Sequence, residues 1–211
     1  MRINLIFYIM KKNHLFIALL LLFSAAIYAQ TPESLLNAGH LLDSTGNFDK
    51  ALKKFDKAIQ LKPDYAEAYN ARGMARLKKL DHEGAMKDIT YAIELKPNYA
   101  EAYSNRAILK NELEDSRGAI QDLDKAIELN PSFVQGYNFR GLIRGRLGDH
   151  IGEIQDYTKA ISIKPNYAEA YHNRGHAKLL TGDKNGACLD FSKAGEFGYF
   201  KAYDDIKENC K

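Results

Sequence analysis

Residues 100–133 read AEAYSNRAILKNELEDSRGAIQDLDKAIELNPSF, and the same pattern recurs on both sides of this stretch. Prolines mark the period, since they stand at positions 32, 63, 97, 131 and 165 and the last three intervals are 34 residues each. A fixed period of this length indicates a repeat array, in which each unit packs on its neighbours. We therefore place five repeats at residues 32–65, 66–99, 100–133, 134–167 and 168–201.

Each repeat is predicted to form two helices that pack against each other. The proline cannot continue a helix interior, and turn sequences such as LDH, EDS and LGD stand in the middle of the repeat. Small residues at the eighth position and alanine at the twenty-seventh permit the two helices to approach closely. Large apolar residues at the fourth and twenty-fourth positions fill the space around them: Leu35, Tyr69, Tyr103, Tyr137 and Tyr171, and Phe55, Ile89, Leu123, Tyr157 and Phe191.

This order of small residues, large residues and proline resembles the tetratricopeptide repeat (TPR) family over residues 32–201. The resemblance implies an all-α fold, a right-handed superhelical solenoid of five helix-turn-helix repeats. Residues 202–211 read as the C-terminal end of a capping helix. One departure from the family pattern is Glu153, which replaces a small alanine in the fourth repeat and is expected to loosen that hairpin.

A second departure is arginine at the seventh position, where the family carries an aromatic residue or leucine. Arginine there and aspartate at the twenty-third position occur together in four repeats, whereas the first repeat has Ala38 and Lys54. The two positions face each other in an antiparallel hairpin, so ion pairs are favoured over a functional row of arginines. Partly exposed pairs are worth at most about 1 kcal/mol each. The predicted pairs are Arg72–Asp88, Arg106–Asp122, Arg140–Asp156 and Arg174–Asp190.

The first helix of each later repeat is predicted to begin with a capping box. A residue that can cap a helix is followed, three residues later, by Glu or Gln. In a capping box each of these side chains accepts a hydrogen bond from the other residue's backbone N–H. The pairs are Asp64 with Glu67, Asn98 with Glu101, Ser132 with Gln135, and Asn166 with Glu169.

The resemblance implies that the concave face, lined by the first helix of each repeat, holds an extended peptide or a partner's helix. Asparagine suits an extended peptide because it both donates and accepts hydrogen bonds. The alternative is that Met74, Ile108 and Leu142 pack between neighbouring repeats. The candidate groove residues are Asn70, Met74, Leu77, Asn105, Ile108, Asn111, Asn138, Phe139, Leu142, Arg146, His172, His176 and Leu179.

Few residues suggest further chemistry. His172 and His176 have a spacing that can hold a metal, but no acid or cysteine is evident nearby in the sequence to complete a site, so exposed groove histidines are expected and no metal site is predicted. No HExxH, Walker or GxSxG motif is present, so neither catalysis nor a cofactor is predicted. Cys188 and Cys210 lie on either side of a turn near Gly198 and are predicted to form a disulfide, with two buried thiols as the alternative.

Residues 1–29 have the features of a secretory signal peptide: a basic start, the apolar run LFIALLLLF and a small-residue exit. Cleavage is expected after Ala26 or Ala29, and Met1 or Met10 is the translation start. An uncleaved anchor is the alternative, although the apolar run is shorter than the roughly 20 residues of a membrane span. We expect a periplasmic or secreted protein without a stable membrane anchor after cleavage.

Charge argues against nucleic acid as a partner. The chain has 30 basic and 27 acidic residues, and the three-residue excess lies within the predicted signal peptide, which leaves a neutral remainder. The expected function is therefore an exported protein-interaction scaffold that binds a peptide or helix of a partner protein. The alternative is a structural component of an envelope complex, assembled through convex or edge surfaces.

Overall fold

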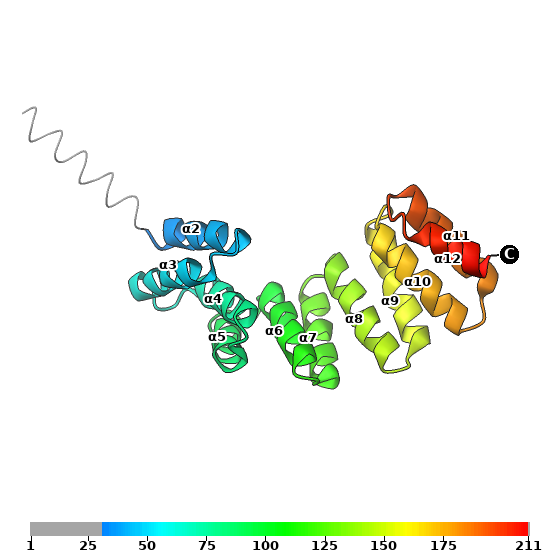
Figure 1. Cartoon of the computed structure of the whole chain (residues 1–211). Helices are drawn as coiled ribbons and strands as arrows, with labels where there is room; N and C mark the ends of the chain where they lie inside the picture. Colours follow the sequence, from blue (N-terminus) through cyan, green and yellow to red (C-terminus); the bar gives the residue numbers. More distant parts are fainter. Residues whose placement is uncertain (1–30, 211) are drawn as a thin grey trace, which may run out of the picture. The chain divides into compact units, whose positions relative to one another are not determined.

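The computed structural model describes residues 31–210 (Figure 1). Within this range the chain is helical and has no strands, which confirms the predicted all-α class. None of the described helices is long and apolar enough to cross a membrane. The predicted signal peptide lies outside the described residues. The helices are α2 (Pro32–Ser44), α3 (Phe48–Leu61), α4 (Ala66–Lys78), α5 (His82–Leu95), α6 (Ala100–Glu112), α7 (Ser116–Leu129), α8 (Val134–Arg146), α9 (His150–Ile163), α10 (Ala168–Leu180), α11 (Lys184–Glu196) and α12 (Ala202–Asn209).

Consecutive helices pack as helix-turn-helix pairs, as the sequence predicts. The pairs α2 with α3, α6 with α7, α8 with α9, and α10 with α11 make the most extensive contacts between helices. The small residues permit this approach, because a Cβ atom added at Gly39 of α2 would lie 2.2 Å from a ring carbon of Phe55 of α3. The predicted pairing of small and large residues is therefore what brings the two helices of a repeat together.

The described chain consists of two compact units, residues 31–91 and 92–210. In the first unit the core lies between α2, α3 and α4 and contains Leu35, Phe55 and Tyr65. In the second unit, buried clusters follow one another along the chain, around Leu123 and around Tyr157. A third cluster packs Phe191 of α11 with Ala202 of α12, so the C-terminal helix completes the core of the last repeat.

The capping-box prediction is wrong. The helices α4, α6, α8 and α10 begin one residue later than expected, and an aromatic residue without a side-chain capping bond precedes each of them. In the later repeats side-chain caps occur instead on the second helices: Asp115 accepts a 2.9 Å hydrogen bond from the backbone N–H of Gly118. The same aspartate–glycine cap recurs as Asp81–Gly84, Asp149–Gly152 and Asp183–Gly186.

Candidate functional site

Four buried ion pairs connect the two helices of the later repeats. Arg106 of α6 donates from Nε and Nη2 to the two carboxylate oxygens of Asp122 of α7, at 2.8 and 2.7 Å. Such two-point contacts are shorter and stronger than neutral hydrogen bonds. The structure places the other three predicted pairs in the same arrangement: Arg72–Asp88, Arg140–Asp156 and Arg174–Asp190.

A second cation, which sequence reasoning missed, binds each of these aspartates one helical turn further along. In the third repeat Lys110 lies 2.8 Å from Asp122. The signal was available in the sequence, because the eleventh position is basic in the same four repeats and is Leu42 in the first. The second cations are Arg76, Lys110, Arg144 and Lys178.

Burial makes the loss of one partner more costly than the roughly 1 kcal/mol expected of a partly exposed pair. The side chains of the four aspartates are only 3 to 6% exposed. Burial by itself lowers the pKa of the Arg72 guanidinium, but hydrogen bonds to Asp88 and Asp56 outweigh it and raise that pKa above its ordinary value. Removing one partner of a buried pair costs about 3–5 kcal/mol, because the remaining charge is left uncompensated.

The arginines also join neighbouring repeats. Arg140 of α8 donates to Asp124 of the preceding helix α7 at 2.6 Å, and Arg72 of α4 donates in the same way to Asp56 of α3. Each guanidinium also lies over the tyrosine three residues before it, as Arg106 does over Tyr103 at 5.5 Å. With these contacts made, the arginines have a structural role and are not a surface for a ligand.

Several predicted groove residues are buried, which leaves their predicted contact with a partner untested. Asn70 is 2%, Leu77 5% and His172 7% exposed. Phe139 and Leu179 are partly buried and pack against core clusters of the second unit. The family pattern places these positions on the inner helix, but burial between helices decides which of them a ligand can reach.

The other candidates reach the surface. Arg146 and His176 are exposed, whereas Met74, Ile108, Leu142 and three asparagines are partly buried. Asn138 of α8 also donates to Glu169 of α10 at 3.4 Å, so its amide contacts the next repeat. The three asparagines are Asn105, Asn111 and Asn138.

The two histidines of α10 contact an acidic residue that the sequence analysis did not identify. Nε2 of His172 lies 2.9 Å from Oδ2 of Asp205 in α12, and Nε2 of His176 lies 3.4 Å from its Oδ1. The two Nε2 atoms are 3.2 Å apart. His172 is therefore not an exposed groove residue. Asp205 comes 33 residues after His172, which is why local spacing did not reveal this cluster.

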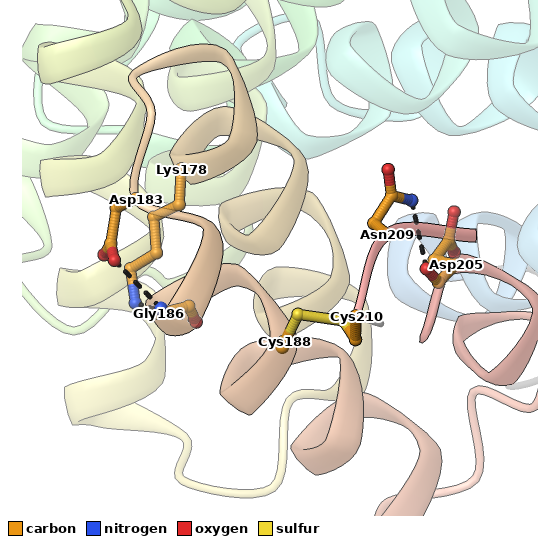
Figure 2. The surroundings of a disulfide bond; sticks show 7 residues. All are labelled: Lys178, Asp183, Gly186, Cys188, Asp205, Asn209 and Cys210. Atoms are coloured by element: carbon orange, nitrogen blue, oxygen red, sulfur yellow. Dashed lines mark hydrogen bonds between the residues drawn. A yellow bond between two sulfur atoms is a disulfide. The ribbon is translucent and has the colours of Figure 1, made fainter. Parts of the chain in front are cut away.

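A disulfide joins Cys188 of α11 to Cys210, the residue that follows α12 (Figure 2). The two Cα atoms are 5.7 Å apart, within the range that a disulfide spans. Figure 2 also shows Asn209, whose side chain donates to the backbone carbonyl of Asp205 at 3.0 Å. The predicted cysteine pair thus fastens the end of α12 to the last repeat.

Glu153 is accommodated rather than disruptive. It is buried in the fourth hairpin, and His150 contacts its carboxylate at 3.0 Å. Space for the longer side chain comes from Gly145 of α8, because a Cβ atom there would lie 2.5 Å from the Glu153 carboxylate. The prediction that Glu153 loosens the hairpin did not take account of Gly145 on the facing helix, which leaves room for the glutamate side chain.

Comparisons with known proteins agree with this helix-pair architecture. Family models described as TPR repeat match residues 39–79 and 154–182, and one described as tetratricopeptide repeat matches residues 100–133 and 134–167. Together these segments cover more than half of the chain. No curated protein sequence matches the chain.

Solved structures resemble the chain over most of its length. The crystal structure of MamA is 28% identical with a TM-score of 0.68, and the match covers 78% of this chain and 96% of MamA. YrrB, a TPR protein with an unusual peptide-binding site, is 21% identical with a TM-score of 0.66, covering 88% and 97%. PilF of Pseudomonas aeruginosa is 16% identical with a TM-score of 0.75, and the match covers 79% of this chain and 76% of PilF. At these identities the likeness to YrrB and PilF shows the fold alone. The chain belongs to the tetratricopeptide repeat family.

Proposed function

We propose that the chain is a protein-interaction scaffold that binds a peptide or a helix of a partner protein along one face of its second unit. We call this surface the inner-helix face and define it by the residues of α6 and α8 that reach solvent at the candidate groove positions. They are Asn105, Ile108, Asn111, Asn138, Leu142 and Arg146.

The proposal is carried by the combination of polar and apolar groups on these two helices. Ile108 and Leu142 are only partly buried, and an asparagine lies one turn before each of them. A partner's backbone can hydrogen-bond to amide side chains while its apolar side chains cover the aliphatic residues. Because both helices are already packed into the fold, little ordering cost falls on the scaffold when a partner binds.

The family supports the broad class of this function. TPR proteins generally bind proteins or peptides and are typically not enzymes, and YrrB is described by its peptide-binding site. The partner, its binding mode and the site on this chain are our proposal. We further propose that binding takes place after export, in the periplasm or outside the cell, because residues 1–29 have the features of a signal peptide.

A second candidate function is assembly of an envelope complex through the C-terminal edge. Three aromatic side chains are exposed there, and Phe200 is the most exposed at 73%. Exposed apolar groups that lie close together often mark interaction sites. The other two are Phe197 and Tyr203.

The two candidates are separated by matched variants used as baits in cross-linking capture, with each captured protein quantified. Leu142→Glu combined with Asn138→Ala alters the inner-helix face. Ile151→Glu, on the exposed surface of α9 in the same hairpin, makes the same aliphatic-to-acid change elsewhere. The proposal expects the partner to be lost from the first bait and retained by Ile151→Glu.

Phe200→Ser serves as the bait for the second candidate. Loss of the partner from Phe200→Ser, with full capture by the Leu142→Glu and Asn138→Ala bait, would support edge assembly and contradict the inner-helix proposal. Circular dichroism of each variant verifies that the helical fold is retained.

A further inference from the structure

Three metal-ligating side chains meet where the last repeat contacts the C-terminal helix. His172 and His176 are one turn apart on α10, and Asp205 reaches them from the first half of α12. One ligand atom from each of the three lies within 4.8 Å of the others. Two histidines with this spacing on one helix are a common arrangement for binding zinc.

The separation of the two imidazole nitrogens matches that of a tetrahedral metal centre. With metal–ligand bonds of 2.0–2.1 Å, two ligands of a tetrahedral zinc ion lie about 3.3 Å apart. The two Nε2 atoms are 3.2 Å apart, and each lies near a different carboxylate oxygen of Asp205, at 2.9 and 3.4 Å. The two imidazole nitrogens and the Asp205 carboxylate are thus close enough together for one tetrahedral ion to bind all three side chains, and a fourth position is left for water or a ligand from outside.

Neighbouring aromatic rings hold the two imidazoles in place. The ring of His172 lies 4.4 Å from that of Tyr199, and the ring of His176 lies 5.0 Å from that of Phe191. His172 is buried, whereas 45% of the His176 side chain is exposed, so an ion can enter from solvent on the His176 side. The ligands are therefore arranged before an ion arrives.

We propose that His172, His176 and Asp205 form a binding site for a divalent transition-metal ion of the zinc type. Two imidazoles with one carboxylate suit zinc and similar ions, whereas calcium and magnesium prefer oxygen ligands. The ion bridges α10 and α12, and the disulfide attaches the far end of α12 to α11. Metal and disulfide together attach the C-terminal helix at two points, Asp205 and Cys210.

The test is a zinc titration of the untagged full chain, by calorimetry or against a chromophoric chelator. Mass spectrometry first verifies that the disulfide is intact, so that no thiolate binds zinc. We expect one equivalent of zinc to bind the unaltered chain. His176→Ala and Asp205→Asn should each weaken binding about tenfold or more. Excess Ca²⁺ should not compete.

The chain supplies its own control histidine. His40 of α2 holds the same repeat position as His176 and lies edge-on to Phe55, as His176 does to Phe191, but it is not part of the cluster. His40→Ala should leave zinc binding unchanged. Zinc should also slow amide exchange in α12 of the unaltered chain and not in His176→Ala.

Three outcomes would overturn the site: no saturable zinc binding by the unaltered chain, zinc affinity in His176→Ala and Asp205→Asn equal to that of the unaltered chain, or loss of binding in His40→Ala. Because His176 is exposed, its replacement by alanine is expected to leave the fold intact, so a folding defect would not imitate the expected result. Circular dichroism of the metal-free variants verifies this.

Discussion

Asp122 is bound by two cations from one helix: Arg106 contacts both of its oxygens, and Lys110 lies 2.8 Å from it. The carboxylate is almost completely buried between α6 and α7, so it depends on both partners for its charge to be compensated. The same three-residue network recurs in four repeats and is missing from the first. It is therefore a fixed part of the later hairpins and not an incidental surface contact.

Removing this carboxylate should be costly. Asp122→Ala removes the carboxylate that compensates two neighbouring cations, and we expect the free energy of unfolding to fall by about 3–5 kcal/mol. Asp124→Ala is the control, since Asp124 is on the same helix and pairs with Arg140 but is half exposed. Its removal should cost less than about 1 kcal/mol. Urea unfolding of both variants provides the comparison, and equal losses would contradict the structural role.

The sequence predicted these networks in part because their members vary together between repeats. Arg106 and Asp122 have counterparts in the same repeats, so one chain contains its own comparison. The cluster of His172 and Asp205 has no counterpart and joins residues far apart in the chain, so neither periodicity nor local spacing could reveal it. The capping-box prediction failed because the three-residue spacing of Asn98 and Glu101 does not determine where the helix begins. The helix begins after Tyr99, one residue later than a box at Asn98 requires.

Gly145 and Glu153 should behave as a coupled pair. Gly145→Leu forces a side chain into the Glu153 carboxylate and is expected to lower the free energy of unfolding by about 2 kcal/mol. Adding Glu153→Ala should recover most of this loss. The second and fifth repeats already contain that combination, as Leu77 with Ala85 and Leu179 with Ala187. A double-mutant cycle measured by urea unfolding should therefore give a clear coupling energy, whereas additive effects would refute the compensation.

Tyr157 should make the fold sensitive to alkali. Burial is the main cause that raises the pKa of the Tyr157 phenol above its ordinary value of 10.0, and the charge of Glu153 adds to it. The folded state therefore keeps a proton that the unfolded chain releases, so stability is complete below about pH 10 and falls as pH rises above it.

Replacing Tyr157 should reduce this dependence. Tyr157→Phe is expected to reduce the loss of unfolding free energy between about pH 10 and 12, whereas Tyr203→Phe, at an exposed position, should not. Urea unfolding at a series of pH values measures both variants. An identical pH dependence in Tyr157→Phe and the unaltered chain would show that the phenol is not protected in the folded state.

The disulfide should stabilise α12 more than the rest of the chain. It closes a loop of 22 residues, for which the chain-entropy model gives roughly 3 kcal/mol. Replacing Cys188 and Cys210 together by serine should therefore increase amide exchange in Ala202–Asn209, while exchange in α6 and α7 stays as it was. The pair is also testable without mutation: two reactive thiols in the unreduced protein would contradict it, and none should appear until a reductant is added.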